Sequence, residues 1–459
     1  MWHRAISRLL SMSCTLPTPS RQSRIAIVGG GITGACAASE LARHFDNVVV
    51  IDQGRRGPGG RASHRSVRKS DGAVLADDNV MDHPVSETLQ FDHGCQFFRS
   101  DSRVMSELLL PNWIANGWVS PWKARLGCMK DTEHTEVKDF FGVPSNEAEV
   151  YIGVGGMHLL PRKILESSRV TVHRGTRVSS VRKNGDKWEL FGTTGEGAYH
   201  DTKEEVAQKE QEQLLCFADA VIFTDISSSS ESWHRASAGI PDSLRELVPK
   251  KARLPLFSCM VALDRPVAPF FPYDGFSVAG NSDLWFAACS QSKPGFPNDG
   301  LECWTLISTP SFAVRQIKDV TMKDVVTGAF RPQENSYLNT VPGPALFDAF
   351  LTAIKPYLSN QEMPKAIYLQ AQRWGSGLPV PDSLVDKVEE ILGTKYCAEL
   401  KSSLVFSTTE SEGHDFIADD ENRLYYAGDF CSNLNPGFEA SALSGISVAQ
   451  HILLNSALQ

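Results

Sequence analysis

The first clear hydrophobic pattern in the chain is an apolar run from Ile25 to Val28, which predicts a buried strand. The run leads into glycines spaced G-x-G-x-x-G, and a helix-compatible segment from Ala35 to His44 follows. A second apolar run, Val48 to Ile51, ends at Asp52. Strand, glycine turn, helix, strand and acid in this order predict a βαβ unit that binds a dinucleotide; a glycine-rich turn without a ligand is the alternative.

The spacing of the motif gives each of its residues a physical role. Gly29 permits the tight turn, Gly31 lets the backbone approach a pyrophosphate, and Gly34 lets the helix pack closely on the strand. The N-terminus of the helix offers free N–H groups and a partial positive charge to the phosphates. Asp52, 18 residues after Gly34, is placed to accept hydrogen bonds from the ribose of an adenosine.

The patterns further along the chain predict both strands and helices. Residues 151–165 predict a short strand and a glycine turn that opens a helix, 170–181 and 187–191 predict a β-meander, and 220–224 predict a buried strand. Residues 203–213 are almost all charged or amide-bearing, so they predict an exposed insertion in the meander.

The middle of the chain, residues 254–412, has a different pattern. Strand-like runs at 256–262 and 303–307 and a helix-like piece at 345–354 lie among several prolines. No further glycine-rich phosphate motif occurs there. This segment therefore predicts a mixed α+β domain inserted between two parts of the nucleotide-binding domain.

Two further motifs flank the middle segment. Gly59-Gly60-Arg61 resembles the G-G-R of the flavoprotein superfamily that includes the amine oxidases, where it contacts the pyrophosphate and flavin of FAD; a mobile basic loop is the alternative. Near the other end, a strand leads into Gly428-Asp429 and a small-residue helix that begins near Glu439. This resembles the closing flavin motif, in which G-D meets the ribityl chain or pyrophosphate; an ordinary turn with Asp429 as a cap is the alternative. We expect the two ends of the chain to meet around one FAD.

Composition excludes several functional classes. The chain has 459 residues, of which 42% are hydrophobic and 22% charged, a balance typical of a globular enzyme of one large or two domains. A net charge of −9 gives no indication of nucleic-acid binding, and no apolar run approaches the ~20 residues of a membrane span. The ten cysteines include no C-x-x-C pair and the twelve histidines no H-E-x-x-H, so neither a metal site nor a disulfide framework is predicted.

Residues 1–23 differ from the rest of the chain. They contain Arg4, Arg8 and Arg21, five serines and no acidic residue. This composition resembles a transit peptide for an organelle, a mitochondrion or plastid, and a disordered extension of a protein of the cytoplasm is the alternative. In either case the segment lies outside the predicted fold.

Taken together, the motifs VGGGITG, GGRAS, FDHGCQFF, VGGMHLL, RW and AGDF…GFEASALSG resemble those of the renalase family, within the amine-oxidase-like flavoproteins. The likeness runs from Arg24 to about His451 and is tight in the FAD segments. It implies an α/β fold, with a Rossmann-type FAD-binding domain and an inserted α+β substrate domain of p-hydroxybenzoate-hydroxylase-like or amine-oxidase-like type. The expected FAD-binding parts are residues 24–105, 150–235 and 405–459, and the expected substrate-domain parts are 106–149 and 236–404.

The resemblance also assigns site residues. It implies that Thr33 meets the pyrophosphate, that Arg61 lies against the phosphates and flavin, and that the backbone of Val178 meets the adenine. It places Gln96 and Phe97 beside the flavin ring, and it matches Gly428, Asp429 and Phe438 to the closing motif.

Two positions in the segment around Gln96 depart from the family pattern, and three side chains can also be interpreted as purely structural. The alanine before the glutamine is Cys95 here, and the tyrosine after it is Phe97, so a hydroxyl at the flavin is lost. Gln96 as a strand cap, Phe97 as a core residue and Trp374 packed beneath the sheet stay open as alternatives.

The resemblance implies a reaction as well. A hydride would pass from a small substrate to N5 of noncovalently bound FAD, and molecular oxygen would reoxidise the flavin. The implied substrate is a reduced or isomeric NAD(P)H, which would enter the substrate cavity directly because the sequence has no second G-x-G-x-x-G. An FAD-dependent amine oxidase or desaturase of the same fold and a non-catalytic flavin-binding protein are the alternatives. No catalytic acid or base is assigned.

Overall fold

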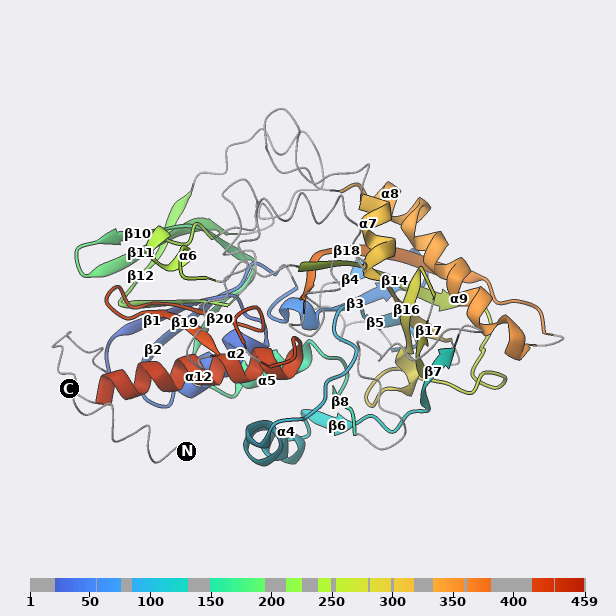
Figure 1. The fold of residues 1–459 in the computed structure, drawn as a ribbon, viewed down its shortest axis with the longest axis horizontal. Coiled ribbons are helices and arrows are strands. Elements are labelled where there is room, and N and C mark those ends of the chain that lie inside the picture. Colours follow the sequence, from blue (N-terminus) through green and yellow to red (C-terminus); the bar gives the residue numbers. More distant parts are fainter. Residues whose placement is uncertain are drawn as a thin grey trace.

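A computed structural model gives the fold of the chain (Figure 1). It describes residues 21–54, 56–75, 85–130, 149–194, 212–224, 238–248, 253–279, 281–298, 301–317, 333–358, 361–380, 415–432 and 434–457. The predicted N-terminal extension and the predicted insertion at 203–213 lie almost wholly outside these residues. The described elements form a Rossmann half, at the left of Figure 1, and a second half around a mainly antiparallel sheet, at the right.

The Rossmann half is built on a six-stranded sheet of order β19-β20-β13-β1-β2-β9. Neighbouring strands pair in parallel, except for β19, which pairs antiparallel with β20 at one edge. The strands are β1 (Arg24–Val28), β2 (Asn47–Ile51), β9 (Thr171–His173), β13 (Ala220–Phe223), β19 (Phe416–Asp419) and β20 (Leu424–Ala427). The predicted Rossmann-type architecture is confirmed. The predicted order of strand, glycine turn, helix and strand is found as β1, the turn, α2 and β2, and the two strands pair in parallel.

Both faces of this sheet are covered, which explains why its strands are continuous apolar runs. Successive residues of a strand point to opposite faces. Ile25 and Ile27 of β1 pack on the side of helices α2 (Ile32–Leu41), α5 (Leu159–Glu166) and α12 (Phe438–Ala457) (Figure 1). Ala26 and Val28 pack on the side of an antiparallel layer made of β10 (Thr176–Asn184), β11 (Lys187–Thr194) and β12 (Gln213–Ala218).

Small residues bring α2 and α12 close together. A Cβ at Gly445 would lie 2.2 Å from the carbonyl oxygen of Thr33, so a larger residue would push the two helices apart. Helix α2 begins at Ile32, three residues earlier than predicted, because Gly31 of the motif is itself the N-cap. The unbonded N–H groups of the first helical turn therefore lie directly at the glycine turn.

The second half is built on a six-stranded sheet of order β18-β14-β17-β16-β15-β7. Its strands pair antiparallel, except for β7, which is parallel to β15. Helices α7, α8 and α9 pack over one face. The elements are β7 (Leu126–Lys130), β14 (Arg253–Leu263), β15 (Gly275–Ala279), β16 (Leu284–Cys289), β17 (Cys303–Ser308), α7 (Pro310–Ile317), α8 (Asn335–Thr340), α9 (Pro342–Leu358) and β18 (Ala366–Pro379). Among the described helices, none combines the length and apolar composition that crossing a bilayer requires.

Smaller elements lie between the halves. A sheet of β3 (His64–Arg68), β4 (Val74–Leu75) and β5 (Thr88–Asp92) packs on β14, where Val67 and Phe91 meet Met260. Strands β6 (Val119–Pro121) and β8 (Tyr151–Gly153) pair beside helix α4 (Leu110–Ala115).

The packing of three segments bears on the predicted domain bounds, which stay predictions. Strands β3 and β5, in the part assigned to the FAD-binding domain, pack against the second sheet. Helix α6 (Asp242–Arg245), assigned to the substrate domain, packs on the Rossmann half through Leu244. The ordered fold also begins before residue 24, because Asp46 N–H donates to the carbonyl of Arg21 at 3.0 Å. Polar boundary segments carry no hydrophobic periodicity, so their sequence does not show which half they join.

Candidate functional site

The glycine turn is crowded everywhere except at Gly31. A Cβ at Gly34 would lie 2.0 Å from the carbonyl oxygen of Gly29, and one at Gly30 would lie 2.9 Å from Pro58. Gly29 itself adopts φ 108°, a conformation that favours glycine. A Cβ at Gly31 would meet nothing closer than the Cα of Gly60, at 3.8 Å. The turn therefore leaves open space at the residue predicted to let a pyrophosphate approach.

Asp52 ties the glycine turn to the loop that follows β2. Its Oδ2 accepts a hydrogen bond from Gly30 N–H at 2.7 Å, and its Oδ1 accepts one from Gly54 N–H at 2.9 Å. Burial raises the pKa of this carboxyl, although both backbone bonds favour the ionised form. Each carboxylate oxygen has a further lone pair, so the predicted bond to a ribose is compatible with this geometry and stays a prediction.

The two outer flavin-type motifs are in direct contact. The guanidinium of Arg61 donates from Nη1 to Asp429 Oδ2 at 2.9 Å and from Nη2 to Asp429 Oδ1, a bidentate pair across 368 residues. Nη1 also donates to the carbonyl of Gly377, and the guanidinium lies 5.4 Å from the ring centre of Phe430. The Asp429 carboxylate is fully buried, whereas 34% of the Arg61 side chain is exposed. The G-G-R and G-D motifs are thus joined by an ion pair, and their contacts with FAD stay predictions.

The closing motif also meets the first turn of α2. Gly428 adopts φ 143°, and a Cβ there would lie 4.0 Å from Thr33 Oγ1. Gly428 N–H donates to Ser444 Oγ of α12 at 2.8 Å, which holds the loop against that helix. Thr33, Gly428 and Asp429 are therefore brought together, although no side-chain bond joins them among the described residues.

Phe438, the first residue of α12, packs in the protein. Its ring stacks on Phe98 with centres 4.6 Å apart. The next residue, Glu439, accepts hydrogen bonds from the N–H groups of Asp101 and Ser102. The N-terminus of α12 is thus fixed to the segment that follows Gln96 and Phe97.

The segment 92–98 is held by bonds to its own carbonyl groups. Gln96 is buried, and its Nε2 donates to the carbonyls of Asp92 and Gly94 at 2.6 and 2.9 Å. The Gln96 amide thus bonds the last residue of β5, in the manner of a strand cap, and its place beside a flavin stays a prediction. Among the described residues, no acceptor bonds the backbone N–H of Gly94, Gln96 or Phe97. If this segment lies beside a flavin, it can meet the ring through these three donors.

Aromatic rings line one side of this segment. Phe97 is half-buried, with its ring centre 6.1 Å from Trp122 and 5.7 Å from Phe286. Trp374 donates from Nε1 to the carbonyl of His93 and to Ser258 Oγ, and its ring stacks on His93. Trp374 thus packs against the segment 92–98.

Val178 lies at the far end of the predicted dinucleotide path. It is buried in β10, paired with Gly192 just before a register shift. Two residues earlier, Thr176 N–H donates to the carbonyl of Asp52 at 2.9 Å. The strand predicted to meet adenine therefore begins beside the residue predicted to meet the ribose, and both roles stay predictions.

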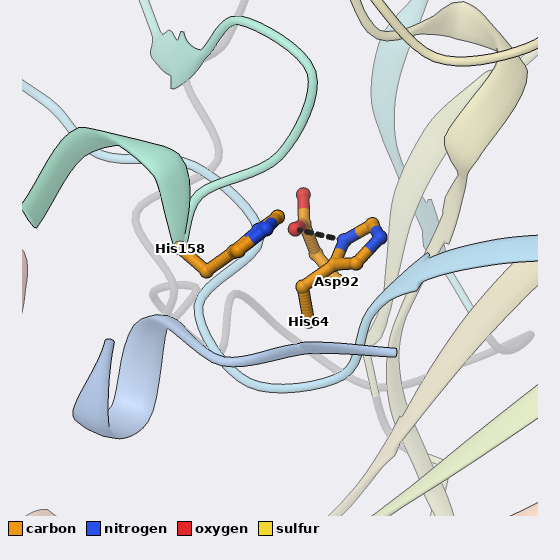
Figure 2. A group of neighbouring side chains, drawn as sticks. All are labelled: His64, Asp92 and His158. Atoms are coloured by element: carbon orange, nitrogen blue, oxygen red, sulfur yellow. Dashed lines mark hydrogen bonds and ion pairs between the residues drawn. The ribbon is translucent and has the colours of Figure 1, made fainter. Parts of the chain in front are cut away.

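A buried charged cluster was missed by the sequence analysis. Asp92 accepts from Lys293 Nζ at 3.0 Å, from Met157 N–H at 3.0 Å, and pairs with His64 Nδ1 at 3.3 Å. Burial opposes ionisation of Asp92, but Lys293 and His64 outweigh it, so the pKa of this carboxyl is held below its usual value. His158 stacks on His64 with ring centres 4.4 Å apart (Figure 2). The motif FDHG shows an acid in the sequence, but nothing local shows the lysine 201 residues away.

The same cluster has the residue types of a metal site. One ligand atom from each of His64, Asp92 and His158 lies within 4.8 Å of the others (Figure 2). However, the carboxylate of Asp92 already balances the buried ammonium of Lys293. A divalent cation here would lie beside that ammonium in a region of low dielectric. We therefore interpret the cluster as a charge network of the protein.

Comparison with known proteins supports the fold. A family profile described as an NAD(P)-binding Rossmann-like domain matches residues 27–109. A protein from Exiguobacterium sp. 255-15 assigned as a protoporphyrinogen oxidase superposes with a TM-score of 0.50 at 12% identity, over 94% of this chain and 99% of that one. A fatty acid isomerase from P. acnes that produces CLA superposes with a TM-score of 0.51 at 10% identity, over the same shares. The chain therefore contains a Rossmann-like domain and shares its overall fold with these two proteins.

Proposed function

We propose that the chain is an FAD-dependent oxidoreductase that accepts a hydride from a small substrate. The observation that carries the proposal is the convergence of three distant motifs at the start of α2. Gly31 of the first motif faces Gly60 of the second, and Arg61 of the second pairs with Asp429 of the third. A nucleotide bound by the Rossmann motif alone would not require the other two to meet there.

The residues present fit FAD. A Cβ would be crowded to 3.2 Å or less at Gly30, Gly34 and Gly60, yet at Gly31 its nearest neighbour would be the Cα of Gly60 at 3.8 Å, so the backbone there is uncrowded, as the approach of a pyrophosphate requires. In the proposal the nucleotide side is held by Gly29, Gly31, Thr33, Gly34, Asp52 and the backbone of Val178. The flavin side is held by Arg61, Gln96, Phe97, Gly428, Asp429 and Phe438.

The chain's own part in the reaction is to orient the substrate and exclude water. When bound, the flavin supplies the hydride acceptor and the later transfer of electrons to oxygen. Phe97, Trp122 and Phe286 pack together as an aromatic wall, in which Phe97 is the partly exposed ring; Phe97 would lie against a flat ring and help to keep water out. Lys293 and Arg61 are both paired with carboxylates, so we assign neither as a general acid.

We infer that the substrate is a reduced or isomeric NAD(P)H. Loss of a hydride would convert the dihydronicotinamide to NAD(P)+, and oxygen would take the two electrons and two protons to become hydrogen peroxide. The proposal is supported by the renalase-like motifs, by the aromatic wall and by the absence of a second G-x-G-x-x-G from the sequence.

Anaerobic mixing tests this function directly. The purified protein, loaded with FAD, is mixed with a panel of dihydronicotinamide isomers and separately with mono- and polyamines, and the visible flavin absorbance is followed. Bleaching by a dihydronicotinamide, followed by peroxide formation when air is admitted, is the expected result. Bleaching by amines alone would indicate an amine oxidase, and bleaching by neither class would indicate a flavin-binding protein without this activity. A protein that takes up no FAD would refute the proposal.

A further inference from the structure

The second half of the molecule reaches the segment 92–98 through one buried lysine. Lys293 follows the 3₁₀ turn Ser290–Ser292 and is 1% exposed. Its ammonium donates to Asp92 Oδ2 at 3.0 Å and to Gln96 Oε1 at 3.1 Å. The same ammonium lies 5.5 Å from the ring centre of Trp122 and 5.8 Å from that of Phe296. A cation buried this completely is retained only where several partners stabilise it.

The two bonds of Lys293 act on both ends of a short loop. Asp92 is where β5 ends, and Gln96 lies four residues later. With its Oε1 bonded by Lys293, Gln96 presents Nε2 to the carbonyls of Asp92 and Gly94. Thr305 Oγ1 also donates to the carbonyl of Asp92, and Trp374 donates to that of His93. The carbonyls of Asp92, His93 and Gly94 are thus satisfied within the protein.

The arrangement leaves several backbone N–H donors of the loop without a partner among the described residues. Three backbone N–H groups, at Gly94, Gln96 and Phe97, have no acceptor in the part of the chain that the structure describes. Without Lys293, the Gln96 amide could rotate and its oxygen would lose its bond. The loop would then be free to redirect those donors.

We propose that Lys293 is a positioning residue, which fixes the backbone of residues 94–97 as a set of hydrogen-bond donors for the flavin ring. Through this contact Lys293 couples the second half of the molecule to cofactor binding. The proposal rests on the proposed function, since it needs FAD to be the ligand. It assigns the role to a residue outside the three flavin-type motifs. It also explains why a charged pair is buried between the two halves, where an apolar pair would give comparable stability.

The test compares Lys293→Met with the wild-type protein. Methionine keeps the length of the side chain but removes the charge and both hydrogen bonds. The Kd for FAD should rise tenfold or more, and the visible spectrum of the bound flavin should shift. The midpoint potential should fall, because the Asp92 carboxylate loses its counter-ion beside the segment. Lys187→Met, which breaks the exposed pair with Asp219 at 3.6 Å, is the matched control and should change none of these readouts.

The outcomes separate the two proposals. If the wild-type protein takes up no FAD, the proposed function fails. If the wild-type protein binds FAD and Lys293→Met shows the same Kd, spectrum and potential, the role of Lys293 is refuted. A higher Kd that merely follows a lower stability of the apoprotein, with unchanged spectrum and potential, would also refute it. If Lys293→Met does not fold, Gln96→Met serves as the second variant, because it keeps the Lys293–Asp92 ion pair and removes only the bonds of the Gln96 amide. An unchanged flavin spectrum and midpoint potential in Gln96→Met would also refute the role of Lys293.

Discussion

Two glycines of one motif should respond to the same substitution in opposite ways. The structure places Gly31 at the N-cap of α2 with φ −71° and ψ −176°, a conformation that alanine adopts without strain. The methyl group of Gly31→Ala would meet nothing within 3.8 Å. That of Gly34→Ala would lie 2.0 Å from a carbonyl oxygen of the same turn and 3.3 Å from Thr224 Oγ1.

The magnitudes follow from these distances. Gly31→Ala should leave the apoprotein unchanged or stabilise it by about 0.4–1 kcal/mol, because alanine has fewer unfolded conformations. The same methyl group would fill the space left for a pyrophosphate, so the Kd for FAD should rise at least tenfold, about 1.4 kcal/mol. Gly34→Ala must move α2 off β1, and overpacking of this kind costs about 1–3 kcal/mol or more of the apoprotein's stability.

The assay combines thermal unfolding of the apoproteins with titration of FAD, followed by the quenching of flavin fluorescence. Gly31→Ala should separate the two readouts, with wild-type unfolding and weakened binding. Gly34→Ala should lose both. Wild-type affinity for FAD in Gly31→Ala would refute the assignment of the open space to a pyrophosphate. Equal destabilisation of the two apoproteins would refute the reasoning from the geometry of the turn.

Three further predictions concern other parts of the chain. Asp52→Ala should raise the Kd for FAD about tenfold to a hundredfold, since it removes charge-assisted bonds to the ribose worth roughly 1.5–3 kcal/mol. Titration of FAD measures this change, and an unchanged affinity would contradict the role of Asp52. Burial and neighbouring cations hold the pKa values of His93 and His158 well below 6.5, so both stay neutral in the folded state while the unfolded chain takes up protons. The free energy of unfolding should therefore fall by up to about 1.4 kcal/mol per histidine and pH unit between pH 6.5 and 5. Denaturant unfolding of His93→Gln should show a weaker dependence of that free energy on pH. Deletion of residues 1–20 should leave folding and FAD content unchanged, and this segment alone should direct a fluorescent reporter to an organelle; a diffuse signal would reject the transit interpretation.

The parts of the fold that follow from local sequence were predicted well. The run Ile25–Val28, the glycine turn and the run Val48–Ile51 could be identified because every contact that defines this unit lies within thirty residues. The predicted helix start is three residues too late, because Gly31 of the glycine motif is itself the N-cap of α2. Helical propensity alone does not show that a glycine begins a helix.

Contacts between distant segments that carry no recognisable motif could not be predicted. Lys293 and Asp92 lie 201 residues apart, and each looks like an ordinary charged residue in the sequence. β12 was missed because its residues alternate poorly between apolar and polar: Leu214 and Phe217 are exposed while Ala218 is buried. Periodicity shows which face of an element is apolar, but it does not show which other element covers that face.

The pairing of Arg61 with Asp429 has a consequence for how the site assembles. The G-x-G-x-x-G motif can form locally. Arg61 of the G-G-R motif, however, is paired only when the last two described elements, β20 and α12, have docked on the Rossmann half. Closing a loop of this length carries an entropic cost that no local contact offsets, so the fold of the intervening half must supply the stability. A cofactor that contacts both motifs can therefore bind tightly only to the completed tertiary structure. Its binding energy would add to the stability of both halves together, because it would favour the one state in which the two ends of the chain meet.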